Sequence, residues 1–295
     1  MKSFGFHSPE TLEEVFALQE KFGEEAKLVA GGTALTIMMK QNLVRPSEVI
    51  SLRGLPEFRD IQPENGTLAL GALVTYSEVE ASPLVRERIP MLAETYHHVA
   101  TLRIRNMATV GGGLVHGDPN QDPPPALIAL RARFRLTSPA GAREIPAEDF
   151  FLDYYETAVK PGEILAEVRV PRPSPRSGQA YLKFLPRTAD DYATVGVAAS
   201  VTLSADGTKC EEVRIGLGCL APTPLRAREA EEVLRGQEPR PEAIREAAEQ
   251  AKEITDPLSD HRGSADYKRE MAGVFVCRAL EQALTRARES FGRSA

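Results

Sequence analysis

The sequence predicts an α+β protein with two domains. A two-lobed N-terminal domain, made of a small βαβ lobe and a larger mixed β lobe with helices, precedes a small antiparallel sheet with a helical bundle. Three observations indicate this architecture. The length of 295 residues suits two domains, helix and strand patterns alternate through the first third, and the proline-rich stretch 171–178 precedes a hairpin and three amphipathic helices. The predicted domains are 1–174, with sub-lobes of about 1–56 and 57–174, and 178–290.

The first lobe is predicted from a β-loop-α-β pattern. The segment Ser8–Thr11 starts a helix. A short strand over 27–30 then ends at Gly31-Gly32-Thr33, and a helix over 34–41 and a strand over 49–52 follow. Such a unit presents a ligand at the turn between its first strand and its helix.

The larger lobe and the C-terminal domain follow from similar patterns. A second glycine cluster, Thr109–Gly113, and a loop rich in Asp and Pro, 118–125, lie between two helices of the larger lobe. Gly216-Leu217-Gly218 lies inside a strand pattern, which favours a bulge or close packing over a ligand loop. The predicted strands are 67–72, 133–136, 164–170, 195–203 and 212–220, and the helices are 90–99, 126–130 and segments within 225–236, 241–254 and 265–288.

Composition excludes several classes of function. Hydrophobic residues make up 42% and charged residues 26%, which excludes disordered and fibrous proteins, and the net charge of -6 argues against nucleic acid as a partner. We find neither a signal peptide nor the run of about 20 apolar residues that a transmembrane segment needs. Cys210, Cys219 and Cys277 are too scattered for a zinc site or an iron–sulfur cluster. We therefore expect a cytoplasmic protein.

Both glycine clusters follow an apolar, strand-like segment. Consecutive glycines let the backbone turn sharply and let several N–H groups point at one anion, and Thr33 and Thr109 add hydroxyl donors. Two such loops could converge on one pyrophosphate, although a tight turn explains either cluster taken alone. Neither cluster is a dinucleotide-binding fingerprint or a P-loop.

Other candidate residues indicate no metal or nucleophile. Exposed or capping roles are favoured for His97, His98 and His116, because no further metal ligands stand at the required spacing. Arg103 and Arg105 either steady a phosphate or lie on a solvated strand face. Because no Ser-His-Asp or Cys-His arrangement is legible, the chemistry is expected to come from a cofactor.

The motifs together resemble the flavoprotein subunits of molybdenum hydroxylases. These subunits belong to the wider family named for vanillyl-alcohol oxidase and p-cresol methylhydroxylase (PCMH). The likeness covers nearly the whole chain and makes the expected N-terminal domain a PCMH-type FAD-binding domain. It rests on Leu28-Val29-Ala30-Gly31-Gly32-Thr33-Ala34-Leu35, Ile104–Leu114, His116-Gly117-Asp118-Pro119, Asp122–Leu127 and Arg262–Arg269.

The resemblance implies a set of FAD-binding residues. The two glycine segments would wrap the diphosphate, Asp122 would accept hydrogen bonds from the ribose or adenine side, and Asp190 and Tyr192 would lie at the exposed flavin edge. Gly113 departs from the family, where many members have Asn or a small residue. The implied cofactor-binding residues are Val29, Ala30, Gly31, Gly32, Thr33, Ala34, Leu35, Leu102, Ala108, Thr109, Gly111, Gly112, Gly113, Asp122, Leu165 and Lys183.

The resemblance also implies partners. A large molybdenum-pterin subunit and a small iron–sulfur subunit with [2Fe-2S] clusters, in a dimer of heterotrimers, would deliver electrons to the FAD of this chain, and NAD or a quinone would accept them. Thr33-Ala34 stands where carbon monoxide dehydrogenases more often have His and Ser, which argues against carbon monoxide as the substrate. Two alternatives stay open: a free-standing flavin oxidase and a non-enzymatic nucleotide-binding scaffold.

Overall fold

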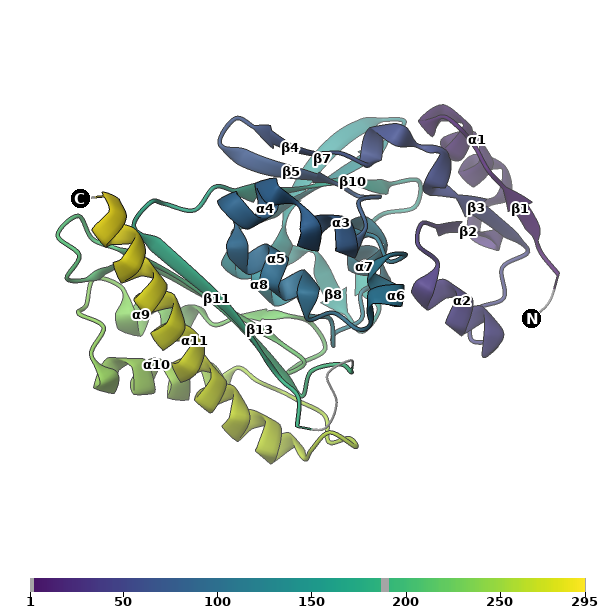
Figure 1. Ribbon diagram of the computed structural model, residues 1–295. Helices are drawn as coiled ribbons and strands as arrows, with labels where there is room; N and C mark the ends of the chain where they lie inside the picture. The colour runs from purple at the N-terminus through teal and green to yellow at the C-terminus, as the bar shows by residue number, and fades with distance from the viewer. Residues whose placement is uncertain (1–2, 187–190, 295) are drawn as a thin grey trace.

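The small N-terminal lobe is a three-stranded parallel sheet flanked by helices. The computed structural model describes residues 3–186 and 191–294, and this lobe lies at one end of the molecule (Figure 1). Its sheet order is β1-β3-β2, with Val15 and Ile50 fully buried in its core. The elements are β1 (Gly5–His7), α1 (Leu12–Phe22), β2 (Ala26–Val29), α2 (Thr33–Lys40) and β3 (Glu48–Ser51). The predicted βαβ unit is therefore confirmed as β2-α2-β3 with parallel pairing.

The larger lobe combines an antiparallel sheet with six helices of the described chain. Its strands are ordered β4-β5-β10-β6-β7, and a separate hairpin is formed by β8 and β9. The strands are β4 (Ile61–Glu64), β5 (Thr67–Gly71), β6 (Arg133–Ser138), β7 (Gly141–Pro146), β8 (Phe151–Asp153), β9 (Glu156–Thr157) and β10 (Ile164–Pro171). The helices are α3 (Tyr76–Ala81), α4 (Pro83–Arg88), α5 (Pro90–His97), α6 (Leu102–Arg105), α7 (Val110–His116) and α8 (Pro123–Ala129).

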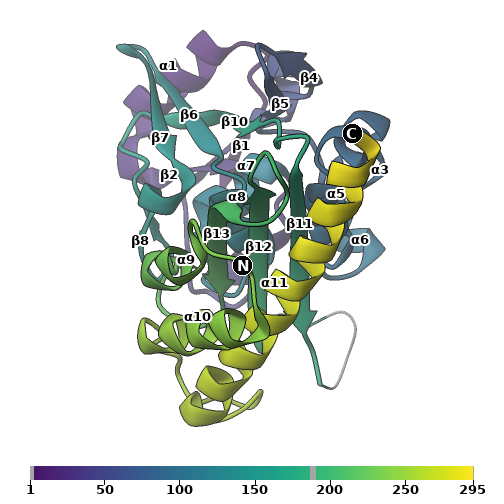
Figure 2. The ribbon, with the colours of Figure 1, turned by 90° about the vertical axis from the view of Figure 1, so that its left-hand side faces the viewer.

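The C-terminal domain is a four-stranded antiparallel sheet between helices. The long helix α11 crosses one face of the sheet (Figure 2), and α8 of the larger lobe packs against β12 and β13. Close packing requires glycine here, because a Cβ at Gly216 would lie 2.1 Å from the Pro125 carbonyl oxygen and one at Gly178 would lie 2.1 Å from that of Ala283. The elements are β11 (Ser177–Phe184), β12 (Val195–Leu203), β13 (Cys210–Gly218), β14 (Leu225–Arg226), α9 (Arg228–Leu234), α10 (Pro241–Glu253) and α11 (Ala265–Ser294).

Three details differ from the sequence-based expectations. The second glycine cluster lies in helix α7 rather than in a loop, and Arg103 and Arg105 lie on helix α6 rather than on a strand. Prolines occupy the first turn of α8, so this helix begins at Pro123 instead of residue 126. The α+β fold class itself is confirmed, and none of the described helices is long and apolar enough to cross a membrane.

Candidate functional site

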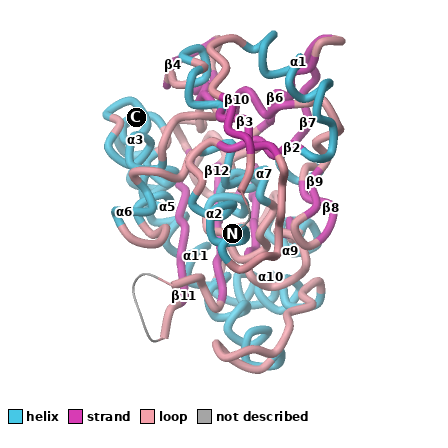
Figure 3. The backbone as a smooth tube through the Cα atoms, turned by 90° about the vertical axis from the view of Figure 1, so that its right-hand side faces the viewer, coloured by secondary structure: helices cyan, strands magenta, loops and turns pink. Residues whose placement is uncertain are grey.

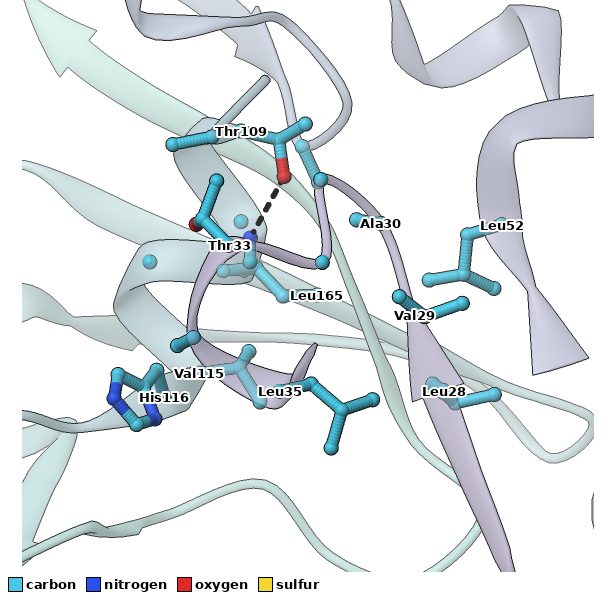
Figure 4. A pocket seen from close by; sticks show the side chains of 18 of the residues that line it. Leu28, Val29, Ala30, Thr33, Leu35, Leu52, Thr109, Val115, His116 and Leu165 are labelled. Atoms are coloured by element: carbon cyan, nitrogen blue, oxygen red, sulfur yellow. Dashed lines mark hydrogen bonds between the residues drawn. The ribbon is translucent and has the colours of Figure 1, made fainter. Parts of the chain in front are cut away.

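A cavity of about 840 Å³ lies where the two N-terminal lobes meet the C-terminal domain. Its volume is in the upper part of the range of about 300–1,000 Å³ that is typical of small-molecule and cofactor sites. Figure 3 views the molecule from the end formed by the small lobe, and Figure 4 shows the cavity from close by. Both glycine segments line the cavity, as do Leu165 of β10 and Lys183 of β11.

The first glycine segment, residues 30–35, offers unpaired backbone donors. Gly32 has a φ of 75° and is the N-cap of α2, which explains the glycine at this turn. Arg53 donates from Nε to the Ala30 carbonyl oxygen at 3.3 Å and so holds that carbonyl. In the part of the chain that the structure describes, the N–H groups of residues 31–35 have no hydrogen-bond partner. Together with the positive end of α2, they suit an anionic group such as a diphosphate.

The second glycine segment, residues 109–113, plays a different part from the one expected. Its N–H groups already bond within the protein: Val110 to Val74, Gly111 to Ala72, Gly113 to the Thr109 carbonyl and Gly112 to the Thr109 hydroxyl at 3.2 Å (Figure 4). The backbone donors of Val110, Gly111 and Gly113 are therefore engaged with other backbone groups, and that of Gly112 with a side-chain hydroxyl. The Thr109 hydroxyl accepts that bond and keeps its own proton free to donate.

The glycines instead bring the two segments together. A Cβ at Gly31 would lie 2.0 Å from the Met107 carbonyl oxygen, and one at Gly111 would lie 2.5 Å from the Ala72 Cβ. A Cβ at Gly112 would lie 3.6 Å from the Ala30 Cβ. The two segments are thus in direct contact beside one cavity, as the motif analysis expected.

A buried polar network closes the cavity toward the C-terminal domain. Asp122 is 3% exposed and accepts hydrogen bonds from the Tyr181 hydroxyl at 2.5 Å and from Lys183 Nζ at 2.9 Å. Lys183 also donates to the His98 carbonyl oxygen at 2.9 Å. Burial raises the pKa of the Asp122 carboxyl, and the bonds from Lys183 and Tyr181 oppose that rise. Asp122 therefore has two protein partners in addition to its place at the cavity wall.

The residues expected at the flavin edge are only partly described. Asp190 lies outside the described residues. Tyr192 lines the cavity and is 43% exposed, and its partial burial and the Asp118 carboxylate raise its pKa. The guanidinium carbon of Arg262 lies 5.6 Å from the centroid of the Tyr192 ring. The same guanidinium forms an ion pair with the Asp191 carboxylate at an N–O distance of 3.0 Å. Leu102, by contrast, is 58% exposed and does not line the cavity.

Several polar residues that were not singled out from the sequence also line the cavity, among them Tyr76 and Gln121. Tyr76 begins helix α3 directly after Thr75, whose capping box with Glu78 was a readable helix-start signal. Gln121 lies in the Asp- and Pro-rich segment, where no sequence pattern marks it.

Of the histidines and arginines considered as metal or phosphate ligands, His97 and Arg105 have side-chain partners within the protein. His97 and Arg105 both pair with Glu80, at 2.7 and 2.9 Å, and Arg105 also donates to the Val99 and Ala100 carbonyls. Arg105 therefore supports the backbone at the cavity wall rather than a phosphate. Within residues 3–186 and 191–294, no group of three or more His, Cys, Asp or Glu side chains could hold a metal ion.

The lining fits FAD in its chemistry. Free N–H groups and threonine hydroxyls suit the diphosphate, and the glycine contacts leave no room for side chains between the segments. Apolar side chains, among them Leu28, Leu35, Val115 and Leu165, suit the planar ring systems (Figure 4).

Comparisons with known proteins agree with this fit. Residues 2–173 match the family of the FAD binding domain in molybdopterin dehydrogenase, and residues 180–283 match the CO dehydrogenase flavoprotein C-terminal domain. The chain is 40% identical over 283 residues to the carbon monoxide dehydrogenase medium chain of Hydrogenophaga pseudoflava, covering 96% of this chain and 98% of that one.

Solved structures give the same relation. A structure of carbon monoxide dehydrogenase from Hydrogenophaga pseudoflava superposes with a TM-score of 0.94 at 40% identity, over 97% of this chain and 98% of that chain. Quinoline 2-oxidoreductase from Pseudomonas putida 86 gives a TM-score of 0.91 at 31% identity, over 97% and 99%. The chain belongs to the FAD-binding medium subunits of molybdenum-hydroxylase-type dehydrogenases and is a subunit of an oxidoreductase complex with FAD as its cofactor.

Proposed function

We propose that this chain accepts electrons from a small iron–sulfur subunit and passes them through its FAD to NAD, a quinone or another acceptor. The bound FAD supplies the redox chemistry, since it can take up and release electrons. The observation that supports this role is the single cavity at which both glycine segments meet and where the N–H groups of residues 31–35 are free.

The chain's own residues would bind and orient the cofactor. We assign the diphosphate to the N–H groups of residues 31–35 and to the hydroxyls of Thr33 and Thr109. The flavin would lie against Leu165, with Lys183 and Asp122 holding the wall behind it. Tyr192, half-exposed at the cavity, would control how closely an acceptor approaches.

The partners proposed are a large molybdenum-pterin subunit and a small iron–sulfur subunit, arranged as a dimer of heterotrimers. The medium-chain relative supports a multi-subunit complex. The cytoplasmic location and the domain boundaries at 1–174 and 178–290 stay predictions.

Rapid mixing of the FAD-loaded chain with its reduced iron–sulfur partner tests the electron path. We expect the flavin absorption to bleach on mixing and to return when NAD, a quinone or ferricyanide is added. The type of acceptor that restores it identifies the physiological class. A flavin that stays oxidised in the assembled complex would contradict the proposal.

A further inference from the structure

Two polar groups at the cavity have no partner in the described chain. Tyr76 is 5% exposed, and its hydroxyl makes no hydrogen bond with any described residue. Gln121 Oε1 is buried and likewise has no partner among the residues described. A buried acceptor without a partner is costly, so Gln121 Oε1 is expected to find one in a ligand, and the Tyr76 hydroxyl, which belongs to a cavity-lining residue, is free to bond to the same ligand.

Both groups converge on the space above Gly113. A Cβ at Gly113 would lie 1.8 Å from the Tyr76 hydroxyl oxygen and 3.2 Å from Gln121 Oε1. The hydroxyl therefore occupies the place where a side chain at position 113 would begin. Only glycine leaves room for it there.

The orientation of the Gln121 amide follows from its other bond. Its Nε2 donates to the Gly113 carbonyl oxygen at 2.8 Å. A carbonyl oxygen can only accept, so the nitrogen must face it and Oε1 must be the acceptor left over.

The pair thus offers one donor and one acceptor. Burial, followed by the nearby Asp122 carboxylate, raises the pKa of Tyr76, so its phenol stays protonated and can donate. A phosphate oxygen could accept from Tyr76 but would be repelled by Gln121 Oε1. A hydroxyl group matches both, because it can accept from one residue and donate to the other.

We propose that Tyr76 and Gln121 together bind a hydroxyl group of the FAD, on its ribityl chain or its ribose, beside Gly113, where the absence of a side chain leaves room for the Tyr76 hydroxyl. This inference rests on the FAD site of the proposed function. It makes Tyr76 and Gln121 binding residues of this chain in addition to the two glycine segments.

Titration of the FAD-free full-length chain with FAD tests the pair. The variant Tyr76→Phe should raise the Kd for FAD about 3- to 10-fold, as expected for the loss of one hydrogen bond. Tyr96→Phe is a matched control, since its ring lies 4.8 Å from that of Tyr76, its buried hydroxyl is also without a partner, and it does not line the cavity. Its Kd should stay within about twofold of that of the unaltered chain.

A parallel titration with ADP separates the two hydroxyl sources. An equal loss of ADP and FAD affinity in Tyr76→Phe assigns the pair to the ribose, and a loss for FAD alone assigns it to the ribityl chain. An unchanged Kd for both ligands, with the unaltered chain binding FAD normally, overturns the inference. Failure of the unaltered chain to bind FAD would instead overturn the proposed site.

Discussion

The buried pair between Asp122 and Lys183 allows the sharpest test of how the two domains are joined. Their side chains are 4% and 3% exposed, and they lie 61 residues apart in the sequence. The substitution Lys183→Met removes the cation, so that the buried Asp122 carboxylate keeps only the bond from Tyr181 and the His98 carbonyl loses the bond from Lys183. Breaking such a pair costs about 3–5 kcal/mol.

Protonation of Asp122 limits the cost and makes it depend on pH. Holding an Asp neutral costs about 1.4 kcal/mol for each pH unit above its ordinary pKa of about 3.9, or about 4 kcal/mol at pH 7 and about 1.5 kcal/mol at pH 5. In the variant the folded-state pKa of Asp122 is raised further, so the folded state binds more protons than the unfolded state. Its stability therefore falls as the pH rises, and its deficit should be smaller at pH 5 than at pH 7.

Urea unfolding of the FAD-free chain, followed by far-ultraviolet circular dichroism, measures this deficit. The chain has no Trp, so circular dichroism is the better probe. Lys160→Met is the matched control, because Lys160 lines the same cavity but is exposed, and we expect a change within about 0.5 kcal/mol. The double variant Asp122→Asn/Lys183→Met should recover much of the loss. A deficit below about 1 kcal/mol at pH 7, or one that is equal at both pH values, would refute the reasoning.

Three further predictions concern the glycine segments and the domain contact. Gly31→Ala places a methyl 2.0 Å from the Met107 carbonyl oxygen, so FAD affinity should fall about tenfold or more by equilibrium dialysis, and unchanged affinity would mean that the segments need not touch. Thr109→Val removes the α7 cap and should lower the unfolding free energy by about 1 kcal/mol, whereas Thr109→Ser should keep the cap and the stability. Equal losses in both variants would mean that the Thr109 hydroxyl does not stabilise α7. Although burial acts in the opposite direction, Arg226 and its neighbours hold the pKa of Glu148 below its ordinary value. The stability that Glu148 contributes is thus lost as the pH falls below about 4.5. In Glu148→Gln the melting temperature should therefore fall less steeply with decreasing pH in this range.

Local signals in the sequence predict the elements that carry the first glycine segment. The helix start at Thr11, the short strand before the first glycines and the turn at Gly32 depend on neighbouring residues only, so patterns of a few residues are enough to find them, although the strand ends at Val29, one residue before the predicted end. The convergence of the two glycine segments could also be predicted from the sequence, because each segment follows a recognisable apolar stretch.

The features that short sequence patterns do not predict depend on tertiary packing. Three consecutive glycines disfavour a helix, yet α7 forms because Thr109 caps it and because Gly111 and Gly113 must pack against Ala72 and Tyr76. The short strand β1 exists only through its parallel pairing with β3, some 40 residues later. The contacts of Asp122 with Tyr181 and Lys183 cross between domains, and no spacing in the sequence predicts them.

Binding of FAD by the purified chain tests the central claim most directly. We predict that the full-length protein is yellow or turns yellow on incubation with FAD, shows a flavin absorption spectrum, and releases intact FAD on denaturation. Gly32→Val and Gly112→Val should lose the flavin while circular dichroism shows the fold retained, because one strains a left-handed turn and the other displaces the Thr109 hydroxyl. A colourless protein that cannot be loaded with FAD, or unchanged flavin content in both variants, would contradict the account.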